Sequence, residues 1–417
     1  MNGTPQAGGG ASVPGVPASP APGVLIVVLA AAAAQTFASM GTSTLPVIAP
    51  KLAEIFGVEA ALIGIQVSIL YGSAAVGASF AGGLVRRLGA CRVSQLALAC
   101  TFIGVSLAAL PSLAFVAVSA IPIGLSIGIL SPAAVHMMLR FAPPAKLNLI
   151  FSIKQTGVPL GHMLSALTAP ILALTLGWRW SLALVALVCA VTIVLFERRR
   201  REWDDDRDPS APLLQSPLVT IRSVWRHPDL RWLVLAGSAF SAVQVCVATF
   251  TVTLLVVEAG YGLVQAGAVL SVVNFCGVTA RVGWGWVADR WKSGMAVLVL
   301  TGMVMGVSAA IAAFLTSAWP PVAVFMIFAA LGVSAIGWNG VMNAEVARRS
   351  QKGEAGSTAS GYSFFVFGAI FVMPTLFSAL YALIGTYSGA YGVLSLVALA
   401  GLGLLWLSHR HIRAATA

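Results

Sequence analysis

The sequence has little charge. Asp, Glu, Lys and Arg make up only 9% of its 417 residues, whereas a soluble domain carries roughly a quarter. Hydrophobic residues make up 59%, and they gather in runs of roughly 20 residues, the length at which a helix crosses a bilayer. The alternation that a β-barrel needs is lacking. The composition therefore excludes a soluble domain and favours a helical protein that crosses a membrane many times.

Several chemical signatures are also missing. The five cysteines are scattered without CxxC spacing, so we expect neither disulfides nor a metal site. There is no GxxxxGK[ST] phosphate loop, which excludes an ATP-driven pump. No Ser/His/Asp constellation indicates an enzyme, and we expect no cofactor and no catalytic residues. Residues 1–23 lack the basic stretch that opens a signal peptide, so we expect a disordered tail.

Twelve apolar spans follow this tail. When both chain ends are placed on one side, all but four of the 24 Lys and Arg residues fall on that side. Such a bias marks the cytoplasmic side of a membrane and explains the net charge of +11 without a nucleic acid partner. The predicted spans are 24–48, 60–84, 93–111, 114–139, 149–174, 180–197, 231–257, 264–288, 294–315, 320–345, 358–383 and 390–408.

The longest polar interval divides these spans into six and six. It begins with four arginines and continues with acids and prolines, which is typical of a solvated linker. We therefore predict an all-α membrane protein with 12 transmembrane helices in two pseudo-symmetric six-helix bundles. The predicted parts are a cytoplasmic tail at 1–23, an N-terminal bundle at 24–197, a cytoplasmic linker at 198–230, a C-terminal bundle at 231–408 and a cytoplasmic tail at 409–417.

One predicted span carries an arginine deep inside it. Arg281 lies roughly 12 Å from Asp289 along a helix. Burying a guanidinium costs on the order of 3 kcal/mol or more unless it faces water, protein or an anion. Asn274 and Arg281 share one helical face with Ser271 and Gly285, and this face is polar. We predict that it lines an aqueous path; the alternative is a structural contact between Arg281 and the loop that follows.

Lys154 is a second cation inside a predicted span. It either binds substrate or extends to the cytoplasmic interface. The chain's 13 acids lie elsewhere, in loops or at span ends. Two buried cations without a carboxylate partner demand a mobile anion. The arginine fork suits a carboxylate, and the lysine adds a point charge. We therefore predict a small organic anion as substrate; a dicarboxylate would use both cations and a monocarboxylate only one.

Neutral polar side chains in other spans complete the predicted site. Asn and Gln are costly to bury in lipid, whereas a lone Ser or Thr more often bonds a backbone carbonyl. The substrate-binding candidates besides the two cations are Gln35, Gln244, Asn274, Asn339, Trp338 and Tyr362. Two histidines, His162 and His136, are candidates for proton coupling because histidine titrates near neutral pH. The alternative for each is a hydrogen bond between helices.

Two predicted loops resemble each other. After span 60–84 the sequence reads GGLVRRLG, from Gly82 to Gly89, and after span 264–288 it reads GWVADR, from Gly285 to Arg290. Both are similar to the Gly-x-Leu-x-Asp-Arg signature of the major facilitator superfamily. The resemblance covers residues 24–408 and implies a secondary transporter with alternating access. The conformational-switch candidates that it implies are Gly82, Arg86, Arg87, Gly89, Gly285, Asp289 and Arg290. Arg86 departs from the signature, because the family has Asp there.

A finer resemblance lies in the span that holds Arg281. The order Arg281-x-x-x-Gly285-x-x-x-Asp289 is similar to that of monocarboxylate transporters and oxalate–formate exchangers, in which an Arg at this place binds the substrate carboxylate. Monocarboxylate carriers also have an Asp four residues earlier, where this chain has Gly277. In the superfamily the fifth and eighth helices face each other beside the central cleft, which implies that Lys154 and Arg281 converge on one ligand.

The sequence as a whole predicts a multi-pass, monomeric carrier in the cytoplasmic (inner) membrane. It would move a small organic anion, with a proton or a counter-anion as coupling partner. The alternative is an efflux carrier for neutral or anionic drugs or metabolites. Cationic drugs are disfavoured because no acid lies inside a predicted span.

Overall fold

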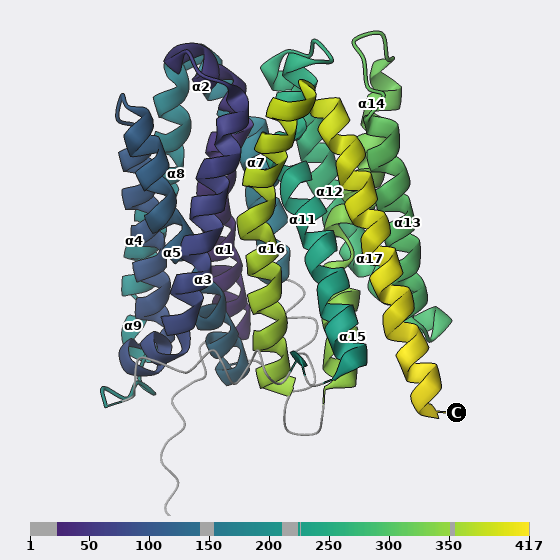
Figure 1. Cartoon of the computed structure of the whole chain (residues 1–417). Helices are drawn as coiled ribbons and strands as arrows, with labels where there is room; N and C mark the ends of the chain where they lie inside the picture. The colour runs from purple at the N-terminus through teal and green to yellow at the C-terminus, as the bar shows by residue number, and fades with distance from the viewer. Residues whose placement is uncertain (1–22, 142–153, 211–223, 226, 351–354, 417) are drawn as a thin grey trace, which may run out of the picture.

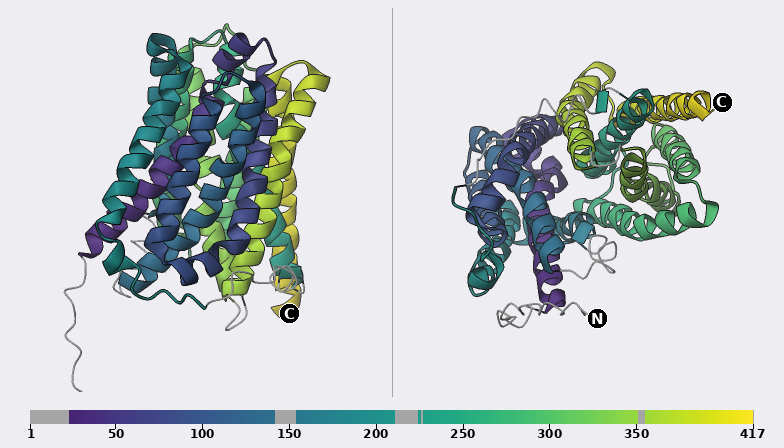
Figure 2. Two further views of the ribbon diagram at one scale, coloured as in Figure 1. Left: turned by 90° about the vertical axis from the view of Figure 1, so that its left-hand side faces the viewer. Right: turned by 90° about the horizontal axis from the view of Figure 1, so that it is seen from below.

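The structure, a computed structural model, describes residues 23–141, 154–210, 224–225, 227–350 and 355–416. They form a bundle of long, roughly parallel helices (Figure 1). Helix α1 begins, and helix α17 ends, at the same end of the bundle (Figures 1 and 2). We call this the basic end, because Arg86, Arg140 and Arg290 lie there; the far end carries Glu59 and Glu258.

The helices before the linker pack mainly against one another. Helix α3 packs along α5, and α4 packs between α5 and α8. The elements are α1 (Val24–Val47), α2 (Ala49–Phe56), the short η1 (Ala60–Leu62), α3 (Ile63–Leu88), α4 (Ala90–Ala108), α5 (Leu113–Phe141), α7 (Gly157–Leu172), the π-helical η3 (Ala173–Gly177) and α8 (Trp178–Glu197). The short helix α9 (Arg200–Trp203) follows in the linker.

The helices after the linker form a second group, which the view from below separates from the first (Figure 2). In this group α17 packs against α11 and α13. The elements are α11 (Pro228–Val257), α12 (Leu263–Trp291), α13 (Gly294–Ala312), α14 (Pro321–Leu331), the π-helical η4 (Gly332–Ile336), α15 (Asn339–Arg349), α16 (Ala355–Ile384) and α17 (Tyr387–Thr416).

The described residues contain 11 helical stretches that are long and apolar enough to cross a membrane. One of them, Gly157–Glu197, has 41 residues; it holds the predicted span 180–197 and the larger part of the predicted span 149–174. Gly177 reverses the chain within it, with φ 103° and ψ 150°, a conformation that favours glycine. Arg179 then donates to the carbonyl of Ala109 at the far end of α4. The all-helical, multi-span fold is therefore confirmed, with α7 and α8 as separate crossings.

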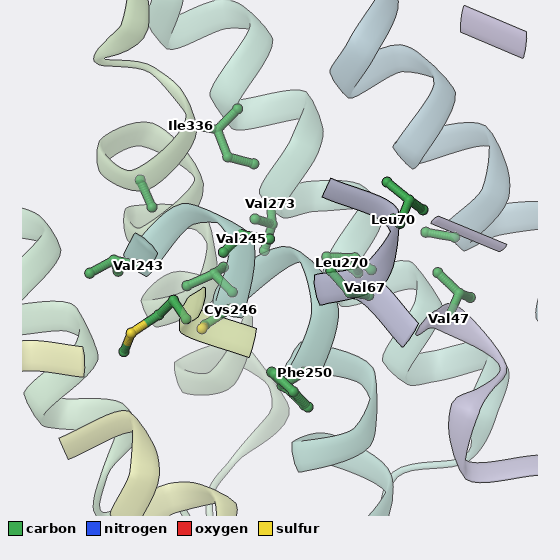
Figure 3. Packing of buried hydrophobic residues seen from close by; sticks show 14 of the residues in the cluster. Val47, Val67, Leu70, Val243, Val245, Cys246, Phe250, Leu270, Val273 and Ile336 are labelled. Atoms are coloured by element: carbon green, nitrogen blue, oxygen red, sulfur yellow. The ribbon is translucent and has the colours of Figure 1, made fainter. Parts of the chain in front are cut away.

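Small residues let neighbouring helices approach closely. A Cβ at Gly157 would lie 2.9 Å from the carbonyl oxygen of Ala32 in α1, and a Cβ at Gly161 would overlap the carbonyl of Thr36. Small residues at such spacing bring membrane helices together. Buried apolar side chains from both helix groups then form one continuous cluster, in which Val67 of α3 and Phe250 and Leu270 of the second group take part (Figure 3).

The described start of the linker is docked against the basic end. Both oxygens of Asp204, which is 8% exposed, accept backbone N–H bonds at the start of α4, from Cys91 at 2.7 Å and from Arg92 at 2.9 Å. A Cβ at Gly89, where φ is 93°, would overlap this carboxylate. The linker therefore supplies the anion that a helix N-terminus favours.

We predict that Asp204→Ala lowers the free energy of unfolding by about 1–2 kcal/mol, because two amides at the N-terminus of α4 lose their acceptor. Burial raises the pKa of the Asp204 carboxyl, so its charge is costly, and Asp204→Asn should cost less. Thermal unfolding of the purified variants measures both effects. Equal losses for the two variants would contradict a capping role.

Candidate functional site

A cavity of about 110 Å³ lies at the centre of the bundle, between the two helix groups. Its walls come from α3, α7, α11, α12, α15 and α16 and from the segment η4. Its polar lining consists of Tyr71, His162, Ser241, Gln244, Asn274, Arg281 and Asn339. No carboxylate lines it among the described residues. The cavity thus combines a cation with neutral hydrogen-bonding groups.

The π-helical segment η4 fixes one side of Arg281. A π-helical turn shifts the backbone hydrogen bonds and leaves carbonyls for other donors. Arg281 Nε donates to the carbonyl of Ile336 at 3.0 Å, and Asn339 Nδ2 donates to the same oxygen at 3.1 Å. Trp284 and Trp338 donate their indole N–H groups to Val333 and Ala335, both at 2.9 Å. The contacts of Arg281 and Trp284 attach α12 to the widened turn.

Arg281 also reaches the first group of helices. Its Nη1 donates to the backbone carbonyl of Gln155, beside the start of α7, at 3.0 Å. The side chain is half-buried, and no carboxylate forms an ion pair with it among the described residues. Arg281 therefore bridges the two groups through carbonyl oxygens alone, which leaves its positive charge without a neutralising partner in the part of the chain that the structure describes.

Lys154 directly precedes Gln155 but does not line the cavity. It is 2% exposed, and its Nζ donates to Ser131 Oγ of α5 at 3.0 Å and to Gln155 Oε1 at 3.3 Å. Within the described ranges it has no carboxylate within ion-pair distance. The two cations predicted to share a ligand therefore lie beside the same short segment of chain, one lining the cavity and one packed against α5.

Three predicted amide side chains meet at the cavity. Asn339 Nδ2 donates to Gln244 Oε1 at 3.1 Å, which connects α15 to α11. Asn274 is 1% exposed and donates to the carbonyl of Leu270 at 2.9 Å, while its Oδ1 has no partner among the described residues. The first pair fixes the width of the cavity, and Asn274 leaves one acceptor without a donor.

His162 lines the same cavity and is held by α1. Its Nε2 lies 3.2 Å from Thr42 Oγ1. Gln35, further along α1, is 3% exposed and packs against Gly157 rather than lining the cavity, and its Oε1 has no described partner. Of the two histidines proposed for proton coupling, His162 is therefore the one that lines the cavity. It also makes a hydrogen bond between helices, which was the alternative prediction for it.

Three other candidates lie away from the cavity. Trp338 is fully buried and packs edge-on against Phe240, with ring centroids 5.6 Å apart. Tyr362 is 7% exposed and packs against Gly237 of α11. His136 lies at the basic end, where its Nε2 is 2.7 Å from Asp206 of the linker. Packing and the linker explain these side chains without a ligand.

Sequence reasoning missed Tyr71, which lines the cavity from α3. A tyrosine in the middle of an apolar span is a signal in itself, because its hydroxyl usually finds a polar partner when buried. Sequence reasoning also missed Ile336, whose backbone carbonyl accepts a hydrogen bond from Arg281. No side-chain pattern marks that carbonyl, since a π-helical turn exposes it.

The predicted switch residues lie at two helix ends. Arg86 and Arg87 are exposed in the last turn of α3, and Asp289 and Arg290 are exposed in the last turns of α12. The backbone carbonyl of Arg86 accepts a hydrogen bond from the amide of Asp208 at 2.7 Å. A Cβ at Gly82 or at Gly285 would meet nothing within 4 Å. A switching role for these loops stays a prediction.

Gly277 packs tightly against η4. A Cβ there would lie 2.5 Å from Ile336 and 3.2 Å from the carbonyl of Gly332. The Asp that monocarboxylate carriers have at this place would therefore displace the segment that holds Arg281.

We predict that even Gly277→Ala lowers stability by about 1–3 kcal/mol through overpacking. Gly285→Ala, on the same helix in open space, is the matched control and should unfold like the parent. Melting curves of the two purified variants make the comparison. Parent-like melting of Gly277→Ala would show that η4 moves away at little cost.

Hydrogen bonds between the helix groups gather at the far end. Thr375 Oγ1 donates to Ser68 Oγ at 2.8 Å, and Tyr381 donates to Glu59 at 3.3 Å. Ser378 donates to the carbonyl of Ala61. We call these contacts of α16 with residues 59–68 the far-end lock. Together with the packing of Gly267 on Ala166, the lock closes the far side of the cavity.

Comparison with known proteins gives a family and a fold. The family model described as Major Facilitator Superfamily matches residues 31–374. A search of curated proteins finds no match. The fold is similar to that of a POT family transporter in complex with 5-aminolevulinic acid, with a TM-score of 0.73 at 13% identity over 92% of this chain and 95% of that one.

Two further solved structures give the same result. A POT family transporter in complex with a thioalcohol conjugated peptide has a TM-score of 0.76 at 13% identity, over 93% of this chain and 96% of that one. The peptide transporter POT in complex with sulfate has a TM-score of 0.75 at 16% identity, over 93% and 95%. Identities this low establish similarity of fold alone.

Proposed function

We propose that this chain, which belongs to the major facilitator superfamily, carries a small organic anion, a mono- or dicarboxylate, by alternating access. Membership of the family makes it a secondary transporter of a small molecule and not an enzyme. The observation that carries the proposal is Arg281, a permanent cation in the central cavity without a carboxylate partner among the described residues.

The hydrogen bonds of Arg281 leave capacity for a ligand. A guanidinium has five N–H donors, and two of them are used on the carbonyls of Ile336 and Gln155. The remaining donors suit the two oxygens of a carboxylate. Carbonyl dipoles offset a buried charge only in part, so an arriving anion gains both charge pairing and hydrogen bonds. A neutral ligand would gain only the hydrogen bonds.

The rest of the lining limits what else can bind. A cation, or the amino group of a peptide, would need an acid, and the described lining has none. The amides of Gln244 and Asn339 already bond each other. His162 and Tyr71 lie in the same wall and offer neutral polar groups. Although the fold is similar to that of peptide carriers at 13–16% identity, the positive charge of this cavity favours an anion over a peptide as substrate.

The distribution of contacts suits a carrier that is closed at its far end. We propose that the basic end faces the cytoplasm, by the bias of basic residues, and that the halves rock about the central site. Opening toward the far side then requires the far-end lock to separate. We also propose that the carrier works as a monomer and couples transport to a proton or to a counter-anion.

Flux into proteoliposomes tests the substrate class. We expect saturable uptake of at least one labelled carboxylate from a panel of formate, acetate, oxalate and succinate. Unlabelled members of the panel should compete, and a lipophilic cation or a dipeptide should not. Loading the vesicles with the same anion, or imposing a pH gradient, identifies the coupling partner. Uptake of neutral compounds alone, with no carboxylate transported, would favour the efflux carrier.

A further inference from the structure

A second cavity lies at the far end, apart from the central site. Its volume is about 210 Å³, and it is lined by α2, η1 and the starts of α3 and α5. Its walls are mostly apolar, with Leu52, Phe56, Ile63 and Val116 among the lining residues. No step of transport described above uses this space.

One polar side chain of this cavity lacks a partner. Gln66 lines it from the first turn of α3 and is 5% exposed. Its Oε1 is buried and has no hydrogen-bond partner among the described residues. Buried polar groups are normally bonded, and the apolar walls offer no donor. Gln66 is therefore an unsatisfied hydrogen-bonding side chain in the wall of the cavity, and a ligand there can bond its amide once the side chain turns toward the cavity.

The size and surroundings of the cavity define that ligand. An apolar protein cavity of about 150 Å³ holds benzene, so 210 Å³ holds a ring with a short alkyl chain. Leu62, Ile65 and Leu113 line the cavity and are 41–45% exposed, which gives an apolar entrance at the outside of the helix bundle. A molecule dissolved in the bilayer meets that surface directly.

We propose that this cavity binds a small membrane-dissolved amphiphile, of the size of an alkylphenol, whose single polar group bonds Gln66. Occupation favours the state that is closed at the far end. The reason is that one segment, residues 59–68, belongs to both features. It lines the cavity, and through Glu59, Ala61 and Ser68 it also bonds α16 in the far-end lock. A ligand that fits this wall in its locked position opposes its displacement.

The binding test uses the full chain in lipid nanodiscs. The probe is 4-propylphenol carrying a photoreactive diazirine, with unlabelled 4-propylphenol as competitor. We expect saturable labelling within residues 49–66 or 113–117. Ala117→Leu, which fills the cavity, should weaken competition at least about tenfold. The matched control is Val118→Leu, because Val118 is the next residue of α5 and is 49% exposed; it should bind like the parent.

Two further comparisons separate a built site from partitioning into lipid. Gln66→Leu should weaken 4-propylphenol about tenfold but leave propylbenzene, which has no hydroxyl, unchanged. Labelling that rises without saturation, or that Ala117→Leu leaves unaltered, would overturn the site. Equal effects of Gln66→Leu on both compounds would overturn the hydrogen bond.

The link to the far-end lock has its own measurement. Thr375→Ala removes the side-chain bond to Ser68 and keeps the weaker backbone one, without touching the cavity. It should therefore lower the affinity for 4-propylphenol severalfold by depleting the locked state. Unchanged affinity would overturn the link. Neither experiment depends on the identity of the transported substrate, so the site is tested even if the anion proposal fails.

Discussion

Arg281→Gln is expected to lower carboxylate transport about 100-fold while the protein still folds. Removing one partner of a desolvated charge pair costs at least about 2–5 kcal/mol, and glutamine retains no charge for the anion. Its amide can still reach only one of the two carbonyls that Arg281 holds. Initial rates of labelled uptake measure the effect, and gel filtration and melting confirm that the variant is folded.

Arg281→Lys and Lys154→Gln refine this prediction. Lysine keeps the charge but has no planar fork, so Arg281→Lys should transport slowly and bind the anion weakly. Lys154 packs against α5 outside the cavity, so Lys154→Gln should transport both monocarboxylates and dicarboxylates like the parent. Loss of dicarboxylate transport alone would show that both cations bind the substrate. Parent-like transport by Arg281→Gln would remove the central argument for an anion carrier.

Hydropathy alone predicted the spans, because burying a membrane helix requires about 20 apolar residues whatever the tertiary packing. The helical period then predicted how deep Arg281 lies in its span and that Arg281 shares a polar face with Asn274. The one place where the count of stretches differs, Gly157–Glu197, arises from a turn so short that one glycine, Gly177, makes it.

The partners of the polar residues were beyond the sequence. No local sequence motif marks the π-helical turn η4, which packs against Gly277. Neither the carbonyl of Ile336 that Arg281 binds nor the packing role of Trp338 was therefore predictable. The docking of Asp204 on α4 joins residues more than 100 positions apart, and no pairwise pattern in one sequence encodes it. Substrate binding by the predicted residues stays a prediction.

Gly64→Leu is expected to block transport by holding the far end open. A Cβ at Gly64 in α3 would overlap the backbone carbonyl of Pro374 and the hydroxyl of Ser378 in α16. A backbone carbonyl in a helix cannot swing away as a side chain does, so the two helices must separate. Overpacking of this kind costs about 1–3 kcal/mol, which shifts the balance between closed and open states about 5- to 150-fold.

The folded state itself should survive this substitution. The contact joins the two helix groups, and α3 keeps its packing along α5 within the first group. A cysteine at Thr375, placed in a chain whose five native cysteines are replaced, reports the opening. It should react with a membrane-impermeant thiol reagent in Gly64→Leu and stay protected in the parent background.

Val76→Leu is the matched control, because Val76 lies on the same helix and is 54% exposed. It should transport like the parent and protect the cysteine at position 375. If Gly64→Leu unfolds the protein, the contact is needed for folding and not only for closure. If it transports normally with a protected cysteine, the far end closes without the tight approach of Gly64 to α16, and this contact is not part of the closure.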